Sequence, residues 1–195
     1  MIERATEVLC ERNVGLAPQL AKDDSLVDQT EVEIEEDCLK ILALHQPYAS
    51  DLRQIATVLK VNSDLERIAD LACNIANRGA NLHENDNFPI PDDLPEMIRI
   101  ATLMVRMSLD SFVDMDAAKA KEVIEMDGSV DSLQLAVIDE LLAMMKKDSA
   151  LIEGALHCFS ASRHVERIAD HAVNIAEDTI YLVDGEIVRH QNSDD

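Results

Sequence analysis

The sequence is poor in aromatic residues and in residues that break helices. Only 3% of the 195 residues are aromatic, tryptophan is absent, and there are five Gly and five Pro. So few turn-forming residues disfavour a protein with many strands, and the hydrophobic residues, 47% of the chain, must build an aliphatic core. This composition predicts an all-α protein made of long helices.

Positive charge is also scarce, because 17 Lys and Arg stand against 39 Asp and Glu, for a formal net charge of −22. Nucleic acid and anionic membrane surfaces repel such a chain, whereas metal cations and basic protein surfaces attract it. The same charge also serves solubility alone, so it does not by itself decide between these roles.

The cysteines and the apolar segments argue against two further classes. No Cys-x-x-Cys pair occurs, which disfavours a zinc knuckle or a redox motif, and Cys38 and Cys73 are interpreted as small core residues. There is no secretory signal and no apolar run long enough to span a bilayer. We therefore expect a cytoplasmic protein with no membrane span.

One motif occurs twice, at an offset of 100 residues. Residues 65–76 read LERIADLACNIA and residues 165–176 read VERIADHAVNIA. Apolar residues recur in each copy at the three- and four-residue spacing of a helix, and Glu66 and Asp70 share a face beside that apolar stripe. An internal repeat of this kind predicts two similar structural units.

The patterns around the motif are helical in both halves. Helices are predicted over 1–13, 23–44, 50–83, 96–113, 117–146 and 149–182, with a stop at His45-Gln46-Pro47 and a last helix closed by Gly185. Short connections make neighbouring helices antiparallel. We predict two tandem three-helix bundles: a first repeat over 1–84 with a short first helix, a Pro-rich linker over 85–95, a second repeat over 96–190 and a polar tail over 191–195.

Acidic pairs at four-residue spacing occur on the second and third helices of both halves. In the first half, Asp28 and Glu66 each lie 19 residues from Pro47, and Asp24 and Asp70 each lie 23 from it. Equal distance from the turn means equal height in an antiparallel pair, so four carboxylates are expected in one layer, and the second half repeats this about Asp148.

Carboxylate layers of this kind suit Mg, Mn, Ca, iron and Zn. The predicted metal ligands are Asp24, Asp28, Glu66 and Asp70 in the first quartet and Asp127, Asp131, Glu166 and Asp170 in the second. Two simpler interpretations stay open. Asp24 and Asp127 would serve equally as helix N-caps, and Glu66 and Asp70 as a solvated helix face.

With these motifs, the His45-Gln46-Pro47 turn, the segment 49–53 and the ending over 180–190, the sequence resembles the PhoU family of phosphate-signalling proteins. The resemblance implies a multinuclear iron or zinc site on each repeat, with manganese or magnesium left open. The two quartets match the paired (Glu/Asp)-x-x-x-Asp motifs that hold it. The sequence departs from the family pattern in its short first helix, and Leu71 stands where the second copy has His171.

The resemblance also implies a regulatory role. Such a protein is a cytoplasmic, homodimeric negative regulator of phosphate uptake and of phosphate-starvation signalling. Its expected partners are the ATPase of a phosphate ABC transporter and a membrane sensor kinase.

Two other functions are weighed against this one. A carboxylate-bridged di-metal enzyme would use Glu-x-x-His, but Ala69 and Ala169 stand three residues after Glu66 and Glu166. No catalytic triad, phosphate loop or dinucleotide fingerprint is found, and the histidines at 157 and 164 are interpreted as surface or packing residues, so we expect no enzyme. A metal-free acidic scaffold remains the third possibility.

Overall fold

The computed structural model describes residues 1–85 and 88–185. These residues contain helices and no strand. The helices are α1 (Ile2–Glu11), α2 (Ala17–His45), α3 (Ser50–Asn85), α4 (Leu94–Asp114), α5 (Ala117–Lys147) and α6 (Ile152–Asp184), with 3-10 turns at Val14–Leu16 and Ser149–Leu151. The all-α prediction is confirmed. The predicted tail over 191–195, the end of the second repeat and part of the linker lie outside the described residues.

The helices begin where the local chemistry favours it. The start of α2 is at Ala17, earlier than predicted, and Pro18 occupies its first turn, where the missing N–H has no helical partner to lose. Asp116 caps α5, because its carboxylate accepts hydrogen bonds from two backbone N–H groups of the first turn at 3.0 Å. These starts place both acidic pairs of the second helices inside long helices.

Left-handed residues end several helices. Gln46, with φ of 44°, follows the last residue of α2, and Gly185, with φ of 75°, follows the last residue of α6. The N–H of each residue bonds to a carbonyl of the preceding turn, which satisfies part of the helix end. Both predicted helix ends are therefore confirmed.

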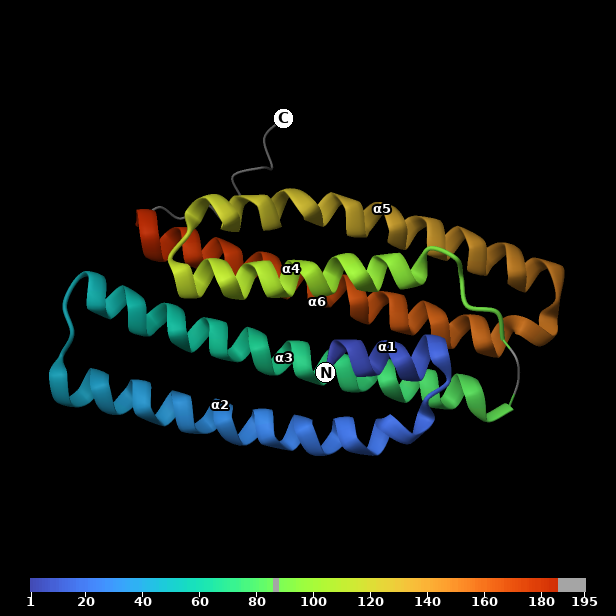
Figure 1. The fold of residues 1–195 in the computed structure, drawn as a ribbon, viewed down its shortest axis with the longest axis horizontal. Helices are drawn as coiled ribbons and strands as arrows, with labels where there is room; N and C mark the ends of the chain where they lie inside the picture. The colour runs from blue at the N-terminus through green and yellow to red at the C-terminus, as the bar shows by residue number, and fades with distance from the viewer. Residues whose placement is uncertain (86–87, 186–195) are drawn as a thin grey trace.

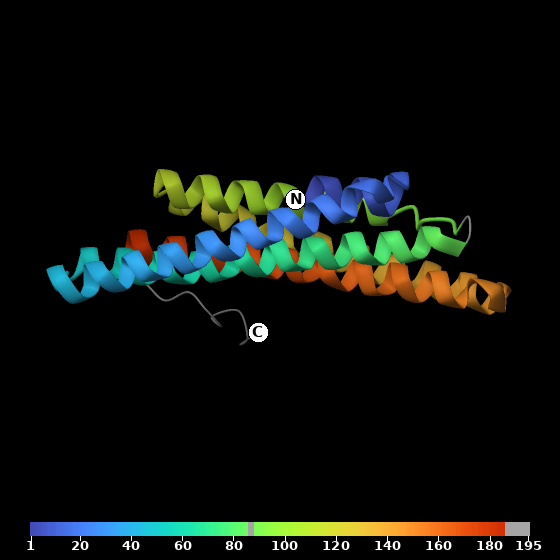
Figure 2. The same cartoon turned by 90° about the horizontal axis from the view of Figure 1, so that it is seen from below.

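The helices are arranged as two antiparallel three-helix units. Helices α3 and α6, which carry the repeated motif, pack side by side through the middle of the molecule (Figure 1). Helices α1 and α4 lie together on one face (Figure 2). The prediction of two tandem bundles is confirmed, and the structure adds that both contribute to one hydrophobic core.

The repeated motif supplies the centre of that core. Ile75 and Ile175 are buried, as are the small Ala72 and Ala172, which allow the backbones of α3 and α6 to come close. Helix α1 has 10 residues where its counterpart α4 has 21, which agrees with the predicted short first helix.

A polar contact also joins the two repeats. His171 on α6 places its Nδ1 atom 2.7 Å from the Asp64 carboxylate on α3, and the Asn174 side chain donates to the same oxygen at 3.4 Å. Leu71 occupies the matching position of the first copy, so this contact has no symmetric partner. No helix in the described part of the chain combines the length and the apolarity needed to cross a bilayer.

Candidate metal centre

The first quartet lies on α2 and α3 and the second on α5 and α6. Asp24 and Asp127 sit in the interior of α2 and α5, so the interpretation of these residues as N-caps is wrong. Asp116 takes that role for α5. The acidic pairs on α2 and α5 are therefore available to face α3 and α6.

The carboxylates of the first quartet interact across the hairpin. Burial raises the pKa of Asp24, and the negative charges of Asp28 on the same helix and Asp70 on α3 add to the effect. The pKa of Glu66 is likewise raised by burial first, with contributions from Asp70 and Asp28 that Arg67 partly offsets. The structure thus brings the pair from α2 and the pair from α3 within electrostatic reach of each other.

The second quartet shows the same arrangement with a stronger effect. Burial, followed by the negative charges of Asp131, Asp170 and Glu166, raises the pKa of Asp127 to about 6. Burial is also the main cause of the raised pKa values of Glu166 and Asp170. Carboxylates that repel one another in this way favour either a proton or a cation among them.

Two arginines partly neutralise the quartets. Arg67 lies 3.4 Å from the Glu66 carboxylate and 3.7 Å from that of Asp70, and Arg163 lies 3.7 Å from Glu166. They stand one or three residues from their acids on the same helices. More than half of each arginine side chain is exposed, which leaves both free to move aside.

The carboxylate oxygens of the two quartets are of the kind that binds hard cations. Asp24 Oδ1 and Glu166 Oε2 are buried and have no hydrogen-bond partner, as expected of oxygens that await a ligand. Within 1–85 and 88–185, no three His, Cys, Asp or Glu side chains stand close enough to hold an ion as they are placed. The residues fit a metal by chemical type, but as placed no three of them converge on one ion.

One residue beside the first quartet was not foreseen as part of it. The thiol of Cys73 donates to the Leu20 carbonyl oxygen at 3.4 Å and lies beside Asp24. Burial, followed by the Asp24 carboxylate, raises the pKa of this thiol to about 12. Its position three residues after Asp70 could have revealed from the sequence that Cys73 lies beside the quartet. The second repeat has Val173 at the matching position, so the two quartets differ chemically.

Both halves of the chain match one family model, that of the PhoU domain, over residues 1–79 and 94–179. The chain belongs to the PhoU family. This confirms the resemblance drawn from the repeated motif, and the two matched ranges correspond to the two helical units.

Curated PhoU relatives cover nearly the whole chain. The phosphate-specific transport system accessory protein PhoU homolog of Aquifex aeolicus is 44% identical over 191 residues, which are 98% of this chain and 86% of the relative. The homolog from Pseudomonas aeruginosa is 40% identical over 192 residues, which are 97% of this chain and 78% of that relative.

Solved PhoU structures share the fold. The crystal structure of PhoU from Pseudomonas aeruginosa has a TM-score of 0.92 at 38% identity and covers 95% of this chain and 89% of its own. The phosphate transport system regulatory protein PhoU from Streptococcus pneumoniae has a TM-score of 0.86 at 29% identity, with 96% and 89% covered. The tandem helical architecture is therefore that of the family.

Proposed function

We propose that this PhoU-family chain is a regulatory accessory protein of phosphate-specific transport that restrains phosphate uptake and the phosphate-starvation response. The observation that carries the proposal is the PhoU-domain match in both halves, together with relatives that bear the name of transport-system accessory proteins. In this role the protein is a cytoplasmic homodimer. It links the ATPase of a phosphate ABC transporter to a membrane sensor kinase.

The proposal includes a metal centre on each repeat. The carboxylates of the two quartets would hold multinuclear iron or zinc, with manganese or magnesium as further candidates, and a bound cation would offset the repulsion that raises the pKa values there. Because each quartet joins two helices of a hairpin, a bound ion would tie the hairpin together. The regulatory surface would then depend on metal supply.

Catalysis is not part of the proposal. Asp70 is 45% exposed, so the first quartet lies at the edge of its bundle and does not exclude water as a di-metal oxygenation site must. His164 lies 3.5 Å from the Ser160 hydroxyl, but its Nδ1 atom is buried with no partner, and burial with the nearby Arg78 and Arg167 lowers its pKa. In a Ser-His-Asp triad an acidic group orients the histidine, whereas the charged groups near this histidine are arginines.

The metal centres predict a stoichiometric metal content. Protein purified without chelator is expected to contain bound transition metal, and the variant Glu66→Ala/Asp70→Ala/Glu166→Ala/Asp170→Ala is expected to lose nearly all of it, because both quartets lose two of their four carboxylates. Elemental analysis by mass spectrometry measures this. A control that removes Glu122 and Glu125, two exposed acids of α5, should keep its metal. Equal metal in wild type and quadruple variant would rule out the quartets as ligands.

The regulatory role predicts a constitutive starvation response without the protein. Deleting the gene should raise alkaline phosphatase expression in phosphate-rich medium to the level of starved cells, because a negative regulator has been removed. The measurement is a phosphatase assay across phosphate concentrations, with the wild-type gene restored in trans as the control. Unchanged expression in rich medium would contradict the proposed role.

A further inference from the structure

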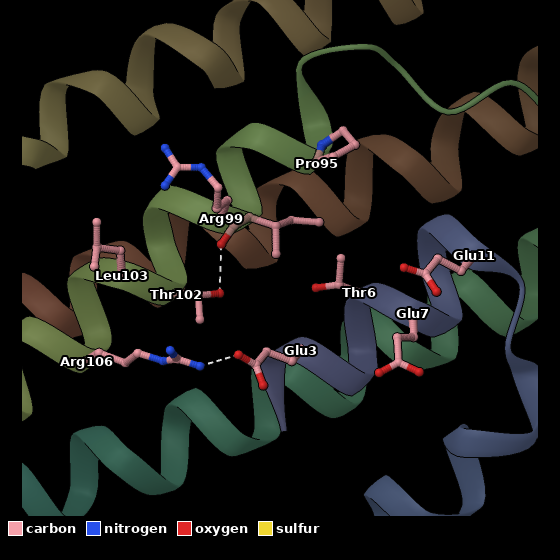
Figure 3. A pocket seen from close by; sticks show the side chains of 10 residues that line it. Glu3, Thr6, Glu7, Glu11, Pro95, Arg99, Thr102, Leu103 and Arg106 are labelled. Atoms are coloured by element: carbon pink, nitrogen blue, oxygen red, sulfur yellow. Dashed lines mark hydrogen bonds and ion pairs between the residues drawn. The ribbon is translucent and has the colours of Figure 1, made fainter.

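A groove lies between α1 and α4, lined by side chains of both helices (Figure 3). Its volume is about 530 Å³, and Ile98 lies among its lining residues with side chains from both helices. Helix α1 buries Ala5, Val8 and Leu9, chiefly on α3, whereas α4 packs on α5 and α6. The first helices of the two repeats therefore scarcely touch each other, and the groove lies on the seam between the repeats.

One ion pair and two inward-facing hydroxyls characterise this seam. Arg106 on α4 pairs with Glu3 near the beginning of α1 and so bridges the groove at that end (Figure 3). Thr6 and Thr102 face the space between the helices, but their hydroxyls donate to carbonyl oxygens of their own helices at 3.0 and 2.8 Å. Neither threonine has a hydroxyl proton left to offer an occupant.

The free charge in the groove is negative. Glu3, Glu7 and Glu11 recur every four residues along α1, so they lie along one side of that helix. Glu3 pairs with Arg106. Among the described residues the carboxylate of Glu7 accepts only the side-chain amide of Asn13, at 3.3 Å, and Glu11 has no ion pair. Glu7 and Glu11 thus lie one turn apart on α1, with Cβ atoms about 6 Å apart.

The α4 side of the groove contributes little positive charge and more apolar surface. The Nε and one terminal nitrogen of Arg99 each donate to the Glu96 carboxylate at 2.7 Å, and the guanidinium points away from α1 (Figure 3). Pro95 and the 38% exposed Leu103 present apolar surface on this helix. The groove therefore sets an acidic wall on α1 opposite an apolar wall on α4.

We propose that this groove docks a basic amphipathic segment of a partner protein, with Lys or Arg against Glu7 and Glu11 and aliphatic side chains against Pro95 and Leu103. Charge complementarity selects this occupant, since the free carboxylates attract a cation and the net charge of −22 repels nucleic acid and anionic lipid. The partner is a component of the phosphate transport or starvation-signalling machinery, and this part rests on the proposed function. Because the walls belong to different repeats, the docked segment contacts both.

Site-specific photo-cross-linking in the native host tests the proposal. A benzophenone amino acid replaces Leu103 in the full chain, and a second chain carries it at Leu135, which is 64% exposed on α5. We expect the Leu103 position to cross-link a segment rich in Lys and Arg, identified by peptide sequencing, and Leu135 to leave that segment unlabelled. The double variant Glu7→Lys/Glu11→Lys should lower the yield about tenfold.

A matched reversal, Glu122→Lys/Glu125→Lys, changes the net charge equally on exposed residues of α5 and should leave the yield unchanged. If the lysine variant at the groove unfolds, Glu7→Gln/Glu11→Gln replaces it, because it removes the charge with little change of shape. A neutral or acidic cross-linked segment, a yield insensitive to Glu7 and Glu11, or a small organic cation retained by the purified protein in native mass spectrometry would overturn the proposal.

The outcomes separate this inference from the proposed function. If gene deletion leaves the starvation response unchanged while the charge-dependent cross-link persists, the regulatory role fails and the docking groove stands. If deletion derepresses the response and the cross-link is absent, the groove fails and the regulatory role stands.

Discussion

Replacing Gly79 with Ala is expected to destabilise the protein by about 2–3 kcal/mol, although alanine is the better helix former. A Cβ atom at this position of α3 would lie 2.7 Å from Leu9 Cα and 2.8 Å from Leu9 N. These are backbone atoms of α1, so no side-chain rotation can relieve the overlap. Helix α1 must move off α3, which loosens the buried Val8 and Leu9.

Urea unfolding followed by circular dichroism measures the change. Gly128→Ala in α5 is the matched control, because a Cβ there meets nothing within 4 Å, and it should gain about 0.5–1 kcal/mol from helix propensity alone. If Gly79→Ala gave the same gain as Gly128→Ala, the close approach of α1 to α3 would be disproved.

Asp127→Asn is expected to stabilise the metal-free protein and to weaken its stabilisation by metal. The pKa of Asp127 is about 6 in the folded protein against 3.8 for an ordinary aspartate, so the folded state binds the proton more tightly between these values. The contribution of this group to stability is therefore full below about pH 4 and is lost as the pH rises through about 6. At pH 7.5 the variant should gain about 1 kcal/mol, a value that allows for solvent screening of a half-buried carboxylate.

Metal is expected to reverse this order. An ion present at a hundred times its dissociation constant stabilises a protein by about 2.7 kcal/mol, and the asparagine variant would gain less because it has lost an anionic ligand. Urea unfolding at pH 4 and pH 7.5, with chelator or with added metal, tests both effects. Asp139→Asn, at an exposed position on the same helix, should change neither. A wild type that is more stable at pH 7.5 than the variant in chelator would contradict the raised pKa.

Helices, turns and the internal repeat were predictable because their signals are local. The apolar spacing within 65–76 and 165–176 determines which side of each helix is buried, and Gln46 and Gly185 end helices through their own backbone conformation. The start of α2 was predicted at Asp23, too late, although Pro18 is well suited to a first turn.

From the sequence, the candidate site could be predicted only as far as the pairing of the two helices in each hairpin. Counting residues from the turn gave the pairing of α2 with α3, since helix rise is constant, and the electrostatic coupling of Asp24 with Asp70 agrees with it. The thiol of Cys73 beside Asp24 depends on how two helices rotate against each other, which spacing does not report. The sequence did not reveal the packing of α3 on α6. An apolar helix face that packs within its own bundle has the same residue pattern as one that packs against a second bundle.

The single core has a thermodynamic consequence for a duplicated protein. Ile75 of the first repeat and Ile175 of the second lie in the same buried cluster, so we expect the two units to unfold together. A ligand that binds the folded protein at one end is then expected to stabilise the whole molecule, so that distant ends share a common equilibrium.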